Sequence, residues 1–506
     1  MRRKSVASAK KKALFNSFIG LATQLILLAL GFLVPRIILK NYGSDTNGFT
    51  NTVVQIFTYV ALLEAGIGTA TRNALYPLLQ KKDEIGISNL MSISRRYFRK
   101  ISLIYLAAVV VLSISLPFLL KSSLSFWTIF FYTLFEGLTA FIGFFFTSLP
   151  IVFLQASGNT FITNIISLVT KVLQYTIKIV LALLLVNILF IQVGYFAISL
   201  LSVLVYGLIM AKKYSWIDYS AKTDSEKLPD RNAYVINEVA QTIFSSTAMI
   251  VLSIFISTKM ASVYSVYNLV YLSISVVIGA IFDSTKYLLG NYFHEDIEKY
   301  KKIHDLFNSV FLGLTIMCMC VAYWLILPFV SLYTKDVNDI DYNYVWLPLL
   351  FSFVNILTRM RTVPGGLTGI AGYAKPVSIC SLIEAALNIT LSLILVHFLG
   401  IYGVLIASVA SLPIKVIFVN YLAEFKILKR NPFRTILIFS CNILLFLATM
   451  IINVFYKITF DSWIWFVVYG FILVAIYGIV VFVINFIINP SMRFYLKTRF
   501  RKANDR

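Results

Sequence analysis

Long apolar stretches alternate with short polar segments along the whole chain. An α-helix needs about 20 apolar residues to cross the hydrocarbon core of a bilayer. We therefore predict an all-α polytopic membrane protein with about fourteen transmembrane helices. The predicted spans are 14–39, 49–76, 101–120, 126–154, 161–185, 189–211, 235–257, 262–290, 305–333, 343–370, 376–398, 402–425, 434–456 and 463–488.

Composition and charge agree with this pattern. The chain is 59% hydrophobic and 13% charged, and its mean hydropathy is +0.84, too apolar for a soluble domain. A net charge of +22 would suggest nucleic-acid binding in a soluble protein. Here, with both termini on one side, 31 of the 44 Lys and Arg fall on that side and five fall in the opposite loops. This bias predicts cytoplasmic termini, because cytoplasmic loops are enriched in Lys and Arg, and it removes the case for nucleic acid.

The first apolar stretch follows a basic start and continues to about Leu39, so we interpret it as an uncleaved membrane helix. The segment from Asp83 to Lys100 is amphipathic, and we expect it to lie on the inner leaflet. The four cysteines have no metal-ligand or disulfide spacing, and the three histidines are scattered. We expect no metal site and no cofactor.

Two stretches resemble each other at one constant offset, without a gap. SLPIVFLQASGNTFITNIISLV begins at Ser148, and TVPGGLTGIAGYAKPVSICSLI begins at Thr362. We predict two six-helix lobes related by a pseudo-two-fold axis along the membrane normal, with a cavity between them. The expected division is an N-lobe at 1–211, a cytoplasmic linker at 212–234, a C-lobe at 235–425, and two further helices with a basic tail at 426–506.

The fifth predicted span carries a polar stripe. Its members are spaced three and four residues apart and therefore share one helical face: Asn164, Ser167, Lys171, Gln174 and Lys178. Charges inside a membrane are costly and usually face a cavity or a partner. We interpret the face as substrate-binding, while a structural seam, or an ion pair with Glu64 or Glu136, remains the alternative.

The matching helix of the second lobe keeps the stripe but loses its cations. The matched residues are Ser378, Ser381, Ala385, Asn388 and Ser392, with Glu384 beside them. Three more cations are candidate ligands. Arg359 and Arg361 precede a Pro-Gly-Gly break, and Lys415 follows Pro413. Arginine forks bind phosphate oxygens, although snorkelling to the interface explains these arginines equally well.

Two further charge patterns indicate a gate or an ion relay. Asp283 and Lys286 are three residues apart, and Glu64 and Arg72 are expected to share a helical face. Glu384 belongs to the same group of candidates. Plain ion pairing is the alternative for each of these residues.

The segment LLEAGIGTATRNAL, which begins at Leu62, follows a GSDTNGF loop and precedes the amphipathic KKDEIG segment. With twelve helices in two repeats and two trailing helices, the chain resembles Wzx-type O-antigen and capsule polysaccharide flippases. These belong to the multidrug/oligosaccharidyl-lipid/polysaccharide exporter superfamily. The resemblance implies transport of an undecaprenyl-pyrophosphate-linked oligosaccharide from the inner to the outer leaflet of a bacterial cytoplasmic membrane by alternating access.

The resemblance also implies membrane lipids, a coupling ion (Na+ or H+) and the polysaccharide polymerase machinery as partners. Two alternatives stay within the superfamily, a lipid II (peptidoglycan precursor) flippase and a drug or metabolite antiporter of the MATE type. The antiporters typically have twelve spans and fewer cavity cations. An enzyme is disfavoured, because the predicted outer loops are too short to carry a catalytic site and no nucleotide-binding loop is present.

Overall fold

The computed structural model describes residues 2–64, 67–219, 231–456 and 458–495, and they fold into α-helices joined by short connections. The chain divides into two compact units, Met1–Ser262 and Val263–Arg506. The helices of unit 1 are α1 (Arg2–Val60), α2 (Ile67–Lys81), α3 (Glu84–Leu119), α4 (Phe126–Ile142), α5 (Ser148–Ala156), α6 (Thr160–Leu183), α7 (Ile188–Lys213) and α8 (Arg231–Phe255), with short helices η1 (Ala61–Glu64) and η2 (Gly143–Thr147) between them.

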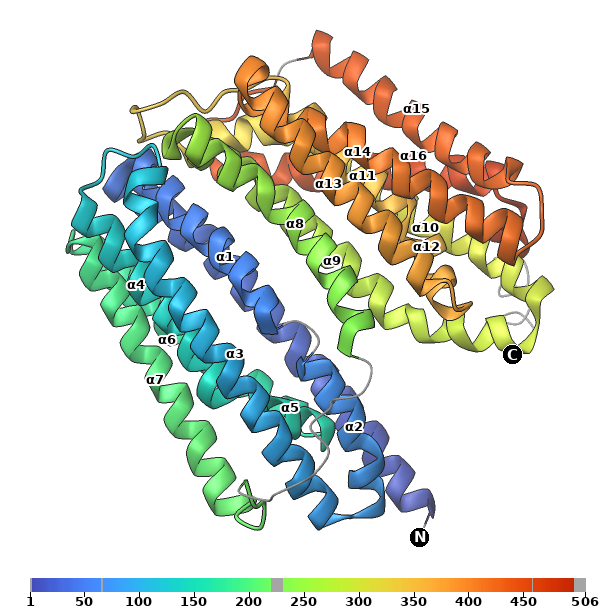
Figure 1. The fold of residues 1–506 in the computed structure, drawn as a ribbon. Coiled ribbons are helices and arrows are strands. Elements are labelled where there is room, and N and C mark those ends of the chain that lie inside the picture. The colour runs from blue at the N-terminus through green and yellow to red at the C-terminus, as the bar shows by residue number, and fades with distance from the viewer. Residues whose placement is uncertain (1, 65–66, 220–230, 457, 496–506) are drawn as a thin grey trace. The chain divides into compact units, whose positions relative to one another are not determined.

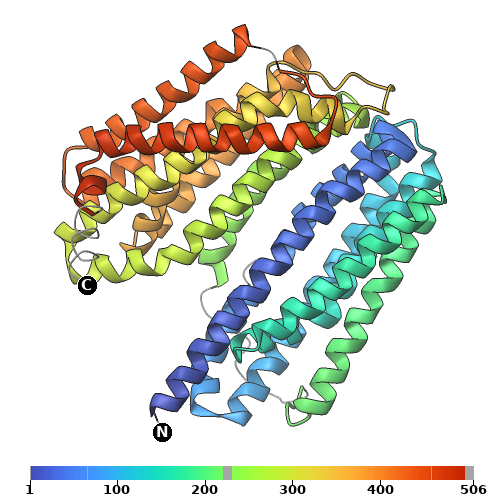
Figure 2. The same cartoon turned by 180° about the vertical axis from the view of Figure 1, so that it is seen from behind.

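Unit 2 contains the yellow-green to red helices of Figures 1 and 2. They are α9 (Thr258–Glu295, which begins just before the unit boundary), α10 (Ile297–Tyr333), α11 (Leu347–Met360), α12 (Thr362–Ile370), α13 (Ala374–Leu399), α14 (Ile401–Tyr421), η3 (Leu422–Ile427), α15 (Phe433–Phe455) and α16 (Trp463–Ile488).

Helices cover all fourteen predicted spans, which confirms the all-α membrane fold. Among the described residues, eleven helices are long and apolar enough to cross a membrane, and Val239–Phe255 is a shorter apolar helix. The difference in number has three sources. One helix, Ile26–Glu64, runs through both of the first two predicted spans, and the described apolar part of the seventh is the shorter helix Val239–Phe255. The span predicted at 343–370 is broken at Arg361 into α11 and α12.

The first two predicted spans meet at Gly43, which divides α1 into two helices. Its φ of 81° and ψ of 176° are not helical, and a φ in this range favours glycine. The second part of α1 then runs along α8, where Thr52 contacts Ser253 and Tyr59 contacts Thr247. Asn47 contacts Ser262, near the beginning of α9.

These contacts place α8 with the first unit, so the compact units divide later than the lobes predicted from sequence. Gly48 packs closely here, because a Cβ atom at this position would lie 1.7 Å from the backbone oxygen of Thr258. Thr258 also donates a hydrogen bond to Asp45. The lobe boundaries at 211 and 235 stay a prediction.

The duplicated segments adopt the same local structure. Helices α5 and α6 begin at Ser148 and Thr160, and α12 and α13 begin at the matching positions of the repeat, Thr362 and Ala374. Each pair is joined by a glycine with positive φ, 72° at Gly158 and 83° at Gly372. The closing hydrogen bonds also match, with 2.8 Å from Asn159 N to Leu154 O and 2.9 Å from Tyr373 N to Thr368 O. This agreement in backbone geometry supports the internal duplication.

The expected surface position of the amphipathic segment is wrong. Residues 84–100 form the first half of α3 and continue directly into the membrane span. Ile87 and Met91 are buried and pack in a core cluster with Leu75 and Met210. The apolar face of this segment therefore packs on protein, whereas the prediction placed it against lipid.

The last two helices are bound to unit 2 by polar contacts inside the bundle. The side-chain amides of Asn442 (α15) and Asn485 (α16) exchange hydrogen bonds of 3.1 and 3.2 Å. Trp324 of α10 donates to the hydroxyl of Tyr477 at 2.8 Å. Figure 2 shows α16 lying along α10. Burial of paired polar groups fixes how these helices pack, because an unpaired amide in the membrane interior is costly.

Candidate functional site

The polar stripe of α6 is directed toward α7 inside unit 1. The Lys171 ammonium donates a hydrogen bond of 2.9 Å to the hydroxyl of Tyr195, and the Lys178 ammonium lies 3.9 Å from the centroid of the same ring. Gln174 is 2% exposed and donates to the backbone oxygen of Tyr195 at 3.3 Å. One tyrosine therefore contacts all three residues, through its hydroxyl, its ring and its backbone.

The apolar side chains of α6 occupy the opposite face. Ile165, Val169, Leu173 and Val180 are all exposed, as expected for a face that contacts lipid. The beginning of the stripe is separate from Tyr195. Ser167 is exposed, and no hydrogen bond joins Asn164 to this group among the described residues. The candidate site in unit 1 is thus the half of the stripe from Lys171 to Lys178.

A carboxylate approaches the same place from α4. Glu136 accepts a hydrogen bond of 2.6 Å from Gln192 of α7 and lies within electrostatic range of Lys178. The side-chain oxygens of Gln174 and Gln192 are buried and have no hydrogen-bond partner among the described residues. We call Glu136, Lys171, Gln174, Lys178, Gln192 and Tyr195 the unit 1 cluster. It holds two ammonium groups, one carboxylate and two unsatisfied acceptors.

Unit 2 has an ion pair at the duplicated position. Nη1 of Arg361 lies 2.5 and 2.7 Å from the two oxygens of Glu384. Glu384 is 3% exposed. Lys415 of α14 is buried within electrostatic range of both groups. No hydrogen-bond or ion-pair partner of its ammonium lies among the residues that the structure describes. We call Arg361, Glu384 and Lys415 the unit 2 cluster.

Arg359 and Arg361 have different partners. Nη2 of Arg359 donates to the backbone oxygen and the hydroxyl of Ser275 on α9, at 2.5 and 2.7 Å. Nε of Arg359 is buried with no hydrogen-bond partner in the part of the chain that the structure describes, and Asp283 lies within electrostatic range. The break at Arg361 between α11 and α12 separates the two side chains, so they do not act as one fork in this structure.

Glu64 and Arg72 were expected to share the face of one α-helix, but they belong to different elements. Glu64 lies in the short 3-10 helix η1, and Arg72 lies on α2, which begins at Ile67. Arg72 donates to the side-chain oxygen of Gln155 at 2.9 Å. The α-helical spacing does not apply to this pair, because Glu64 is in a 3-10 helix. The side chain of Lys286 lies outside the described part of the structure, so its proposed pairing with Asp283 stays a prediction.

A charged group that sequence reasoning missed lies where α14 ends. Arg430 contacts Glu424 at 2.6 Å and Asp305 at 2.5 Å, and both carboxylates are 1% exposed. Burial lowers the pKa of Arg430, but its hydrogen bonds to Glu424 and Asp305 outweigh this effect and the net pKa is raised. Because its partners come from different helices, no local pattern identifies this group.

Tyr195 and Gln192 were also missed. They are three residues apart on α7 and share a face of an otherwise apolar helix. This spacing of two polar residues is the sequence signal that could have identified them. Among the described residues, no group of three or more His, Cys, Asp or Glu side chains is placed to hold a metal ion. The two clusters combine half-buried or buried cations with buried amides, an arrangement suited to binding anionic oxygens.

Comparison with solved structures identifies the fold. No protein-family model and no curated protein matches the sequence. An inward-facing multidrug resistance MATE family transporter of the MOP superfamily has a TM-score of 0.62 at 16% identity, over 86% of this chain and 99% of its own. The lipid II flippase MurJ, in an inward closed conformation, has a TM-score of 0.63 at 14% identity, over 93% of this chain and 99% of its own.

A third match is a MOP superfamily transporter from Pyrococcus furiosus, with a TM-score of 0.58 at 17% identity, over 84% of this chain and 97% of its own. Reversed polarity of its binding pocket suggests a different function for that protein. At these identities the likeness establishes the fold. The chain has the all-α polytopic fold found in MOP superfamily transporters, and MATE transporters and MurJ are two groups that share it.

Proposed function

We propose that this chain is a flippase that moves an undecaprenyl-pyrophosphate-linked oligosaccharide from the inner to the outer leaflet by alternating access. The observation that carries the proposal is the excess of cations over carboxylates in the two clusters, where Lys415 is buried and the other cations are half-buried. Lys171, Lys178 and Lys415 lie inside the helix bundles, and none of them has a carboxylate within ion-pair distance among the described residues.

An uncompensated charge in a low-dielectric interior is costly, so such groups are retained where they meet a ligand. A pyrophosphate carries several anionic oxygens and is matched by lysine and arginine donors. The prenyl chain of such a substrate would remain in the lipid, so only its polar head would need the cations. Glu136 and Glu384 neutralise part of the charge, and we assign them, with Glu64, Arg72, Asp283 and Lys286, to gating or to coupling with Na+ or H+.

The fold supports the same proposal. The similarity to MurJ, a lipid II flippase, extends over more of this chain than the similarity to the MATE transporter. A lipid II flippase is thus the nearest alternative, and a MATE-like antiporter is the next. We place the protein in a bacterial cytoplasmic membrane with both termini in the cytoplasm, because the Lys and Arg bias supports that orientation.

The test is a deletion strain complemented with the wild type, Lys171→Ala or Lys171→Arg. Surface polysaccharide, accumulated lipid-linked intermediate and protein level are measured together. Lys335→Ala is a matched control, because Lys335 is exposed in a connecting loop and the variant loses the same charge. We expect the deletion to trap the intermediate, Lys171→Ala to fail at normal expression, and Lys171→Arg and Lys335→Ala to rescue.

Three results would contradict parts of the proposal. Intact surface polysaccharide with altered drug tolerance would favour the antiporter. Accumulation of the peptidoglycan precursor with arrested growth would favour the lipid II flippase. Full rescue by Lys171→Ala would leave the function in place and show that the unit 1 cluster is not the binding site.

A further inference from the structure

One turn of α3 gathers four basic residues, Arg95, Arg96, Arg99 and Lys100. Arg96 and Lys100 line a cavity of about 200 Å³ together with Ile93 and Tyr97. The spacing of the cavity-lining residues puts them on one face of the helix. The cavity thus combines two cations, a phenol hydroxyl and an apolar floor.

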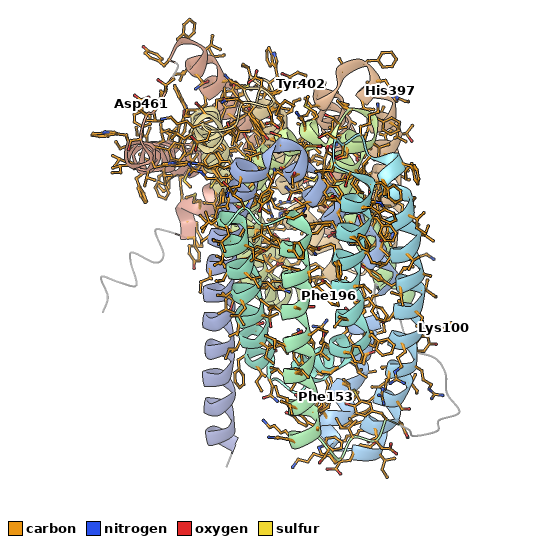
Figure 3. The ribbon with its side chains drawn as sticks, turned by 90° about the vertical axis from the view of Figure 1, so that its left-hand side faces the viewer. Lys100, Phe153, Phe196, His397, Tyr402 and Asp461 are labelled. Carbon is orange, nitrogen blue, oxygen red and sulfur yellow. The ribbon has the colours of Figure 1, made fainter. Side chains whose placement is uncertain are left out.

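Helix geometry gives the position of these basic residues along the membrane normal. The rest of α3 continues from Lys100 to its end at Leu119. At about 1.5 Å per residue this part of the helix is about 28 Å long, close to the thickness of the hydrocarbon core, about 30 Å. When the apolar part of α3 spans the membrane, Arg96 and Lys100 therefore lie at the level of the phosphates of one leaflet. Figure 3 shows Lys100 at the edge of the unit 1 helices.

The face that carries Arg96 and Lys100 continues as an exposed apolar stripe. Leu103, Val111 and Phe118 follow at helical spacing and are 57%, 64% and 76% exposed. Side chains of this kind on a membrane span contact acyl chains. A molecule bound at the cavity would thus have cations at its polar end and a continuous apolar surface beside its chains.

The charges of this turn are not balanced within the protein. Arg95 lies 4.9 Å from the ring centroid of Tyr219, and Arg99 lies 5.5 Å from that of Phe145. No carboxylate lies within ion-pair distance of Arg96 or Lys100 in the part of the chain that the structure describes. These two cations are four residues apart on a helix, where like charges repel. An anion between them would remove that repulsion.

We propose that Arg96, Tyr97 and Lys100 form a binding site for the phosphate headgroup of an anionic membrane phospholipid, whose acyl chains lie along Leu103, Val111 and Phe118. The site is separate from both clusters and does not depend on the transported substrate. A basic group at the membrane surface binds anionic lipid with about 1 kcal/mol for each Lys or Arg. Because about 1.4 kcal/mol corresponds to a factor of ten, loss of both cations should weaken binding about tenfold or more.

The experiment uses the purified full chain in neutral detergent and titrates phosphatidylglycerol against a phosphatidylcholine background. Bound lipid is counted by native mass spectrometry. The test variant is Arg96→Gln/Lys100→Gln, and the control is Lys212→Gln/Lys213→Gln, which removes two exposed cations at the end of α7. A charge-retaining variant, Arg96→Lys/Lys100→Arg, guards against a folding defect in the test variant. We expect the test variant to lose binding about tenfold, and the control and charge-retaining variants to change less than about twofold.

Competition identifies the source of the phosphate. We expect millimolar inorganic phosphate to leave phosphatidylglycerol bound, because it offers no acyl chains to the apolar stripe. Equal losses in the test and control variants would overturn the proposal, since they would show binding to diffuse charge. So would displacement by inorganic phosphate, or preferential displacement by a polyprenyl pyrophosphate, which would make the cavity a docking site for the transported lipid.

Discussion

The duplicated helices α6 and α13 occupy the same position in the sequence repeat, but α6 carries cations on its polar face and α13 carries a carboxylate beside it. Gln174 and Asn388 occupy matching positions, and both are buried amides, 2% and 1% exposed. In α6 the flanking positions hold Lys171 and Lys178, which contact an aromatic ring. In α13 they hold Ala385 and Ser392, and the neighbouring Glu384 forms an ion pair.

The difference shows that the repeat preserved a polar helix face and not a particular chemistry. Asn388 donates to Ser408 and Ser411 at 3.1 and 3.4 Å, so the amide of α13 is paired with its neighbour α14. The face of α6 keeps ammonium groups that tyrosine only partly satisfies. We therefore expect loss of the Arg361–Glu384 ion pair in unit 2 to affect stability first, and substitutions in the unit 1 cluster to affect transport first.

The largest expected effect is in unit 2. Glu384→Gln removes a buried carboxylate that pairs with Arg361 and faces Lys415, and we expect a loss of about 3–5 kcal/mol in the free energy of unfolding. The measurement is thermal unfolding of the purified protein in detergent. In Glu384→Leu/Arg361→Met both charges are removed, so stability should return toward the wild type. If the single variant unfolds at the wild-type temperature, the ion pair is not structural.

The turns at Gly158 and Gly372 test whether the two repeats depend equally on this glycine. A left-handed conformation costs a non-glycine residue about 1–2 kcal/mol, so Gly158→Ala and Gly372→Ala should each lower stability by this amount. Gly207→Ala is the control, because no atom lies within 4 Å of its added Cβ and the site is inside α7, where alanine is favoured. Unequal losses at the two turns would show that the repeats differ in how their turns are supported.

Removal of the Tyr195 hydroxyl is expected to affect stability less than transport. Tyr195→Phe keeps the ring beside Lys178 but removes the hydrogen-bond acceptor of Lys171, which should cost about 1 kcal/mol. We expect impaired transport in the complemented strain at normal protein level. Tyr206→Phe, on the same helix, is the matched control. Unimpaired transport in Tyr195→Phe would show that substrate binding does not require the tyrosine hydroxyl.

The smallest effect, and one of opposite sign, is expected at Lys415. Lys415→Met removes a buried ammonium that lies beside Arg361, so stability should be unchanged or rise by up to about 1 kcal/mol. Transport should nevertheless fall if the ammonium binds substrate. Thermal unfolding and complementation are measured on the same variant. A marked loss of stability would instead assign Lys415 a structural role in balancing Glu384.

Much of the fold could be predicted from the sequence because it depends on local properties. The length of each apolar stretch sets a membrane span, and helical spacing puts Lys171, Gln174 and Lys178 on one face. The constant offset between the two similar stretches also matches Gly158 with Gly372, and the structure gives both glycines a positive φ. These features require no knowledge of which helices are neighbours.

The predictions that failed needed that knowledge. Glu64 and Arg72 were assigned to one face on the assumption of one continuous α-helix, but Glu64 lies in the 3-10 helix η1 and Arg72 on α2. The segment from Asp83 to Lys100 was assigned to the lipid surface because an amphipathic face does not reveal what covers it. In both cases the spacing was identified correctly and its surroundings were not.

The sequence by itself determined the membrane setting, the helical class, the duplication and the choice of residues that are costly to bury. Only the tertiary structure decided their partners. It placed Tyr195 between two lysines, paired Arg361 with Glu384, and brought Asp305 to Arg430 across 125 residues of chain. The physical reason is that hydrophobic burial and helical periodicity act within a segment, whereas the energy of a buried charge depends on the group that faces it from another helix.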